Sequence, residues 1–114
     1  AGGAGGAASP GMMLRHYAPR TPLEVVAALT PAKVAGAVGV LAWSDAGAAV
    51  ARRGGAAAVA VLSPRGDPAE AAANLFAAIR RLDAAGVALI LAERAPDEGL
   101  GRAINDRLTR AGRG

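Results

Sequence analysis

The chain lacks cysteine, and its 114 residues include a single Trp, a single Tyr and a single Phe. The absence of cysteine excludes disulfides and thiolate metal sites within this sequence, and it fits a cytoplasmic protein. Aromatic residues make up 3% of the chain while hydrophobic residues make up 53%, so a core must be built from Val, Leu, Ile and Ala. No apolar run approaches the ~20 residues of a membrane-spanning helix, and no basic-then-apolar leader opens the sequence. We expect a cytoplasmic protein without a membrane partner.

Lysine is also scarce, since every basic residue except Lys33 is an arginine. The 13 basic residues outnumber the 9 acidic ones and give a formal net charge of +4, which would suit an RNA-binding module. The arginines, however, are spread from Arg15 to Arg113, and several alternate with acids. This spread favours an ordinary solvated surface, and an Ala-, Gly- and Arg-rich chain is also typical of a GC-rich genome.

The first 22 residues differ in composition from the rest. Residues 1–8 contain only Ala and Gly, which is typical of a flexible linker. Residues 9–22, here called the strap, hold the only His and the only Tyr side by side, and their prolines disfavour helix. We therefore predict a tail and interdomain linker over residues 1–22 and a globular domain over residues 23–114. The Ala/Gly start, without an initiating Met, leads us to expect a piece of a longer polypeptide.

The globular part alternates strand-like and helix-like segments. Apolar runs predict strands, and cap residues followed by helical periodicity predict the helices between them. Such alternation implies parallel strands joined by helical crossovers. The predicted fold class is α/β, a small three-layer Rossmann-like domain with a mostly parallel sheet, preceded by an extended linker. The expected strands are residues 23–29, 38–42, 57–62 and 87–91, and the expected helices are a short turn after Thr30-Pro31, residues 44–53, residues 68–85 and a last helix that starts at Asp97 or Glu98.

The helix over residues 68–85 has the clearest signals. Asp67 is placed to cap it, Pro68 takes its first turn, and Glu70 completes a capping-box pattern. The residues expected on its buried face are Leu75, Phe76, Ile79 and Leu82, and those expected on one stripe of the last helix are Leu100, Ile104, Leu108 and Ala111.

Polar residues follow three of the predicted strands, at the sheet edge where ligands bind in α/β folds. They are Ser44-Asp45, Ser63-Pro64-Arg65-Gly66 and Glu93-Arg94. The sequence favours capping and turn roles for all of them, because Ser and Asp cap helices and Gly turns the chain.

No catalytic set is visible in the globular domain. Gly99-Leu100-Gly101 is followed by Ile104 where a dinucleotide-binding fingerprint has its third glycine, so a phosphate site is not expected there. Asn105 and Asp106 diverge by ~100° on a helix and are expected on the surface. With no cysteine and one histidine, the chain offers no nucleophile-base pair and no metal-ligand spacing.

Three stretches together resemble a known family, the long form of L-threonylcarbamoyladenylate (threonylcarbamoyl-AMP) synthase. The strap, Ser9-Pro10-Gly11-Met12 through His16-Tyr17-Ala18-Pro19, is similar to the linker between its two domains. Residues 74–83 with Gly86 resemble the main helix of its C-terminal accessory domain, and residues 98–108 resemble that domain's C-terminal signature. Three matches in the right order are more specific than any one of them. The family's accessory domain is Rossmann-like, which agrees with the fold predicted above.

The resemblance implies an enzyme that converts L-threonine, bicarbonate and ATP, with Mg²⁺, into threonylcarbamoyl-AMP and pyrophosphate. Such a nucleotidyltransferase serves tRNA modification, because downstream transfer proteins move the threonylcarbamoyl group to an adenosine of tRNA. The resemblance places the catalytic pocket in an N-terminal domain that this sequence does not include. The chain would then supply a lid linker and an accessory domain, and would bind no cofactor by itself; direct contact with tRNA stays open.

The same resemblance assigns the nucleotide-proximal linker residues, which are Pro10, Gly11, Met12, His16 and Tyr17. His16 and Tyr17 would approach the nucleotide, while Gly11 and Met12 would shape the strap. The alternative role of His16-Tyr17 is to anchor the linker to the protein surface. Many family members carry Lys-Tyr where this chain has Met13-Leu14, so one cation and one aromatic are missing from this strap.

Two functions of other classes remain open from the sequence. One is a basic RNA-binding module that helps deliver tRNA, and the other is a free-standing α/β domain that binds a small ligand.

Overall fold

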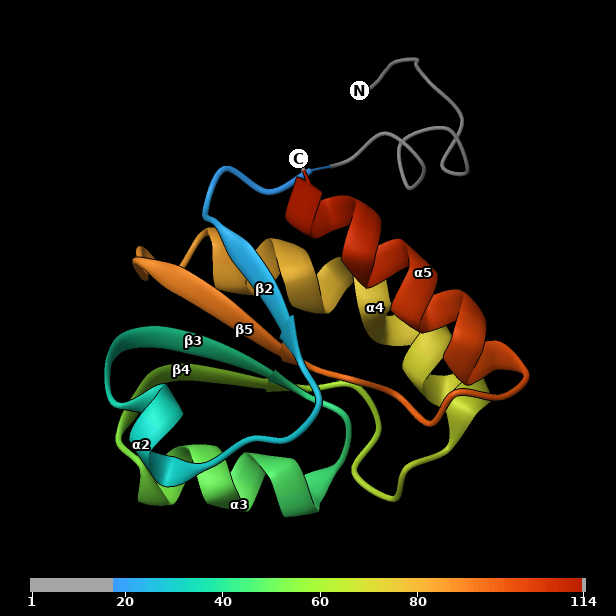
Figure 1. The fold of residues 1–114 in the computed structure, drawn as a ribbon, viewed down its shortest axis with the longest axis horizontal. Helices are drawn as coiled ribbons and strands as arrows, with labels where there is room; N and C mark the ends of the chain where they lie inside the picture. The colour runs from blue at the N-terminus through green and yellow to red at the C-terminus, as the bar shows by residue number, and fades with distance from the viewer. Residues whose placement is uncertain (1–17, 114) are drawn as a thin grey trace.

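The computed structural model describes residues 18–113. Residues 18–113 form four parallel strands and four helices in three layers (Figure 1). The elements are β2 (Leu23–Val26), α2 (Pro31–Val34), β3 (Gly36–Ala42), α3 (Asp45–Arg53), β4 (Ala56–Val61), α4 (Pro68–Asp83), β5 (Leu89–Glu93) and α5 (Leu100–Arg113).

The sheet has the strand order β2-β5-β3-β4, and every pair in it is parallel. Helices α2 and α3 cover one face, whereas α4 and α5 cover the other (Figure 1). The predicted α/β class and mostly parallel sheet are therefore confirmed. Among residues 18–113, no helix is both long enough and apolar enough to cross a membrane.

Alternating side chains of the central strands supply a separate core to each face. Leu41 and Ile90 point to the α4/α5 side, where they join Leu75, Leu82 and Leu108. Val40 and Leu91 point to the other side, where they pack under α2 and α3. Apolar side chains of helices cover both faces of the sheet, so the central strands are continuous hydrophobic runs and do not alternate with polar residues. Both cores consist mainly of Leu, Ile, Val and Ala side chains, as the scarcity of aromatic residues predicts.

Some element boundaries differ from the sequence prediction. The first strand ends at Val26 and not at residue 29, because the sheet partner of Val26 is Glu93, the last residue of β5. The last helix begins at Leu100 and not at Asp97 or Glu98. Gly99 precedes it with a φ of +55°, a left-handed conformation that glycine adopts without strain.

Leu100 also departs from its expected place on the buried stripe. It is 48% exposed, while Ile104, Leu108 and Ala111 of the same stripe are buried. Leu100 is the first residue of α5, and it lines a surface groove with Phe76 of α4.

Asp83, the last residue of α4, holds the two residues Arg20 and Thr21 that come shortly before β2. Its carboxylate accepts hydrogen bonds from the Arg20 and Thr21 amides, at 3.2 and 3.0 Å, and from the Thr21 hydroxyl at 2.9 Å. The chain therefore enters β2 from the C-terminal end of α4.

We predict that Asp83→Ala lowers the free energy of unfolding by about 1–3 kcal/mol, since two amides and a hydroxyl lose their acceptor. Amide hydrogen exchange at Thr21 should accelerate more than exchange in β3. Asp106→Ala is the matched control, because Asp106 is an exposed helical residue whose 3.1 Å ion pair with Arg110 is worth at most about 0.5 kcal/mol. Equal losses in the two variants would show that Asp83 does not hold Arg20 and Thr21 in place.

Candidate functional site

The carboxyl edge of the sheet gathers the polar residues that the sequence placed after the strands. Ser63 donates its amide to the Trp43 carbonyl at 3.2 Å, and Asp45 donates its amide to the Pro64 carbonyl at 3.1 Å. The loops after β3 and β4 are thus joined. Strand β5 lies next to β3 and reaches the same edge at Glu93.

Strands β3 and β5 form the switch point of this fold. They are neighbours in the sheet, yet β3 leads to α3 on one face and β5 leads to α5 on the other (Figure 1). The two loops separate at this point, and in α/β folds a ligand occupies the crevice between them.

Glu93 occupies that position in this chain. Its Oε1 accepts a hydrogen bond from the Trp43 amide at 2.8 Å. Its carboxylate also lies against Gly47 in the first turn of α3, so closely that a Cβ on Gly47 would collide with it. The N-terminus of α3 has partial positive charge from its unpaired amides. Glu93 therefore supplies the negative charge that a bound phosphate would otherwise bring. Ser44, the expected cap, makes no side-chain capping bond.

Two further acidic side chains, Asp67 and Glu70, lie at the N-terminus of α4. The Asp67 carboxylate accepts from the Glu70 amide at 3.2 Å, which confirms Asp67 as the cap. Glu70 does not complete the predicted capping box. Its Oε1 accepts from the hydroxyl of Ser63 at 2.5 Å, and that hydroxyl accepts from the Asp67 amide at 2.8 Å. Ser63 has no exposed surface, and its buried hydroxyl connects the Asp67 amide to the Glu70 carboxylate.

The N-terminus of α5 carries Asp97 and Glu98 in the preceding turn. Asp97 lies 3.9 Å from Arg94 and 3.6 Å from Arg102, both exposed. Gly101, the second glycine of the weak fingerprint, is buried, and a Cβ there would collide with the Pro96 carbonyl oxygen. The glycine therefore serves close packing of the loop on the helix.

Asn105 is the clearest correction to the sequence analysis. It was expected on the surface with Asp106, but it is only 6% exposed. Its Oδ1 accepts from the Ala95 amide at 2.8 Å, and its Nδ2 donates to the Ala95 carbonyl at 2.9 Å. Asp106 is exposed, as predicted. The pattern of one buried and one exposed neighbour follows from their ~100° separation, but the sequence did not indicate which of them faces inward.

The described residues thus hold no open anion site at this edge. Each of the three helix N-termini that meet there has carboxylates of the chain beside it, and no group of three or more His, Cys, Asp or Glu within residues 18–113 could hold a metal ion. The nucleotide-proximal residues predicted in the strap, from Pro10 to Tyr17, lie outside the described residues.

We predict that Gly47→Ala destabilises the protein by about 1–3 kcal/mol, because the new methyl group displaces the Glu93 carboxylate. The cost should fall when Glu93 is also changed to Ala, since the colliding group is then gone. Urea unfolding of the two single variants and the double variant gives the coupling energy directly. Additive losses would mean that Glu93 does not pack on α3 as described.

Asn105→Ala should cost about 2–4 kcal/mol, because it leaves both the amide and the carbonyl of buried Ala95 without partners. Asp106→Ala on the same turn is the control. A loss below 0.5 kcal/mol for Asn105→Ala, measured by urea unfolding, would contradict the double hydrogen bond.

Comparison with protein families identifies this domain. The family described as threonylcarbamoyl-AMP synthase, C-terminal domain, matches residues 3–112. No curated protein sequence and no solved structure matches the chain. The match includes the residues of the strap as well as those of the α/β domain. The chain belongs to the family of threonylcarbamoyl-AMP synthase C-terminal domains.

Proposed function

We propose that this chain is the lid linker and accessory domain of an enzyme that makes threonylcarbamoyl-AMP and pyrophosphate from L-threonine, bicarbonate and ATP with Mg²⁺. The observation that carries the proposal is the continuous family match over residues 3–112, which takes in the strap. The product would serve tRNA modification through separate transfer proteins, in the cytoplasm. The partner of the chain is then the catalytic part of the same synthase.

The carboxylates at the carboxyl edge of the sheet support a nucleotide site elsewhere in such an enzyme. A nucleotide at this edge would have to compete with Glu93, Asp67 and Glu70 for the helix N-termini. Electrostatic repulsion would therefore disfavour a triphosphate on the described domain. We infer that ATP binds in the catalytic part and that this chain contributes only its strap to the nucleotide.

The proposed role of the strap is to cover the nucleotide. Tyr17 can stack on or hydrogen-bond to a ligand at a pocket edge, and His16 adds a second polar tip. A cover of this kind excludes water from a reactive acyl phosphate. The anchoring of Arg20 and Thr21 on Asp83 supports this role, because it fixes the end of the strap only three residues after Tyr17.

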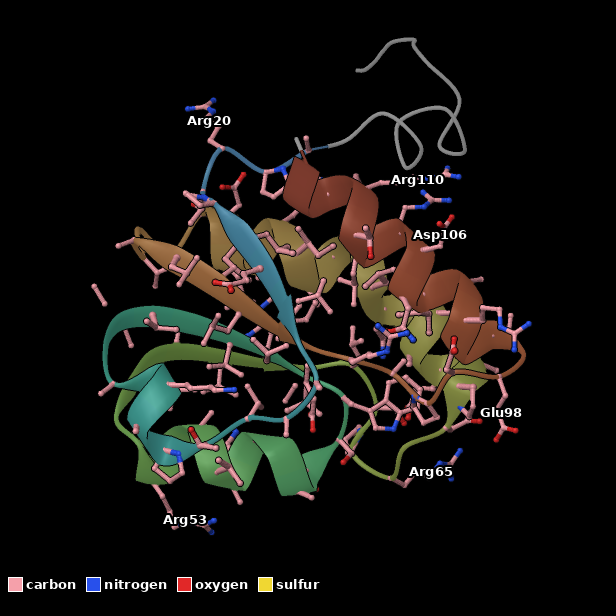
Figure 2. The ribbon with its side chains drawn as sticks, viewed as in Figure 1. Arg20, Arg53, Arg65, Glu98, Asp106 and Arg110 are labelled. Carbon is pink, nitrogen blue, oxygen red and sulfur yellow. The ribbon has the colours of Figure 1, made fainter. Side chains whose placement is uncertain are left out.

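Four arginines of the described residues lie far apart on the surface, and this weakens the RNA-binding alternative. Arg20, Arg53, Arg65 and Arg110 lie at separate places around the periphery (Figure 2). Arg110 is paired with Asp106 at 3.1 Å. A chain that neutralises several adjacent phosphates needs a continuous basic surface.

We predict that Tyr17→Ala and His16→Ala in the complete synthase raise KM for ATP about 2- to 10-fold, equivalent to the ~0.5–1.5 kcal/mol of an aromatic contact. Pyrophosphate release that depends on L-threonine and bicarbonate is the assay, and KM for L-threonine should change less. Tyr17→Phe separates stacking from hydrogen bonding.

Lys33→Ala, an exposed change on α2, is the control and should leave both constants unchanged. Unchanged ATP kinetics in both strap variants would remove the lid role. Absence of threonine-dependent pyrophosphate release from the complete protein would remove the proposed reaction.

A further inference from the structure

Strand β4 is an edge strand of the sheet (Figure 1), and its sequence leaves that edge unprotected. Within residues 18–113, β3 is the one strand that pairs with it. The six residues of β4, Ala-Ala-Ala-Val-Ala-Val, include no charge and no proline, and only Ala60 among them is buried. Charges and prolines are usual means by which edge strands avoid pairing with other chains. The opposite edge strand, β2, is shorter and carries exposed Glu24.

Alternate backbone groups of β4 point away from β3. The Leu62 amide, directly after the strand, donates to the Ala42 carbonyl of β3 at 2.9 Å. Because successive residues of a strand direct their amide and carbonyl groups to alternate sides, those of Ala57, Val59 and Val61 face outward. Within residues 18–113, no loop or side chain bonds to these groups. They form a row of donors and acceptors that a further strand can join.

The charges beside this edge match those of a second copy of the chain. Helix α3 packs on β4, and it begins with exposed Asp45 and ends with exposed Arg52 and Arg53. Among residues 18–113, none of these three side chains forms an ion pair. When two β4 strands pair antiparallel, a two-fold axis perpendicular to the sheet keeps both α3 helices on one face and reverses their directions. Asp45 of each copy is then directed toward the Arg52 and Arg53 end of the other.

The strand is also complementary to itself in shape. A pairing centred on Val59 sets Ala57 of each copy opposite Val61 of the other, and about six hydrogen bonds join the two strands. Ala46 and Ala49 are exposed on α3, and side chains this small let two helices approach closely. A second copy therefore fits both the backbone of the edge and the helix beside it.

We propose that the complete protein forms a two-fold dimer through β4, so that two four-stranded sheets become one continuous sheet. Two-fold pairing uses the open edge of both copies, and association through this edge therefore stops at two. Arg65 of one copy faces Arg53 of the other in this arrangement, and the Asp67 carboxylate, 4.0 Å from Arg65, offsets part of the repulsion. The dimer is independent of the reaction proposed above, because no residue of the strap takes part in it.

Sedimentation equilibrium of the complete protein tests this proposal. The weight-average mass should rise from that of a monomer toward that of a dimer over a ~100-fold range of concentration. Ala57→Lys places a charge on the edge, and Ala57→Pro removes an outward amide without removing a bond to β3. We expect each variant to weaken dimerisation at least about 10-fold. Ala103→Lys, the same change at an exposed position of α5, is the control and should leave the dimer intact.

Amide hydrogen exchange locates the contact within the strand. Exchange at Ala57, Val59 and Val61 should slow at least about 3-fold over the same range of concentration, because these amides become bonded to the other copy. Ala58 and Ala60 should change little, because their amides already face β3.

A mass that stays that of a monomer would overturn the proposal, as would a dimer that both Ala57 variants leave intact. Equal weakening by Ala57→Lys and Ala103→Lys would also overturn it, because net charge and not the edge would then control association. Outward amides that are equally protected at every concentration would overturn it by showing that another segment of the same polypeptide covers β4. Masses beyond that of a dimer would contradict a closed two-fold pairing.

Discussion

The contact between Glu93 and the start of α3 is the constraint on which the arrangement of this domain depends. The carboxylate leaves the end of β5, accepts the Trp43 amide and fills the space that Gly47 leaves open. It therefore joins β5, whose helix lies on one face of the sheet, to the helix on the other face. Without such a tie, the two loops at the switch point would diverge and leave a crevice. The remaining loops follow the same pattern, in which side chains of the domain occupy positions open to a ligand in related folds.

Because the protein's own side chains fill these positions, nucleotide binding, the function usually linked to this architecture, does not follow from the fold. A Rossmann-like sheet binds nucleotides through unoccupied helix N-termini and glycine-rich turns. Here the buried hydroxyl of Ser63 and the carboxylates of Asp67 and Glu70 satisfy the first turn of α4. The small residues Gly47 and Gly101 admit the protein's own atoms and not a phosphate. The protein's own groups therefore occupy this edge, so the fold alone does not imply a nucleotide site here.

The elements and their order could be predicted from the sequence because local signals agreed with the fold. The Asp67-Pro68 start, the apolar face of α4 and the continuous apolar strands depend on neighbours in the chain, and each was found within a few residues of its place. The polar contacts were harder to predict. The capping-box pattern predicted that Glu70 binds the nearby Asp67 amide, but its carboxylate accepts a hydrogen bond from buried Ser63 of the preceding loop. Leu100 keeps the helical period and is still exposed, so the period alone did not show which end of the stripe is covered.

The sequence by itself determined the fold class and the family to which the chain belongs, since these depend on periodicity, composition and ordered motifs. Only the tertiary structure decided the roles of Asn105 and Glu93. Asn105 was one of two adjacent polar residues, and its inward direction follows from the place where the Ala95 loop crosses α5. The Glu93 carboxylate meets an amide fifty positions away because parallel pairing sets β5 beside β3. Such contacts join distant segments, and no local pattern specifies them.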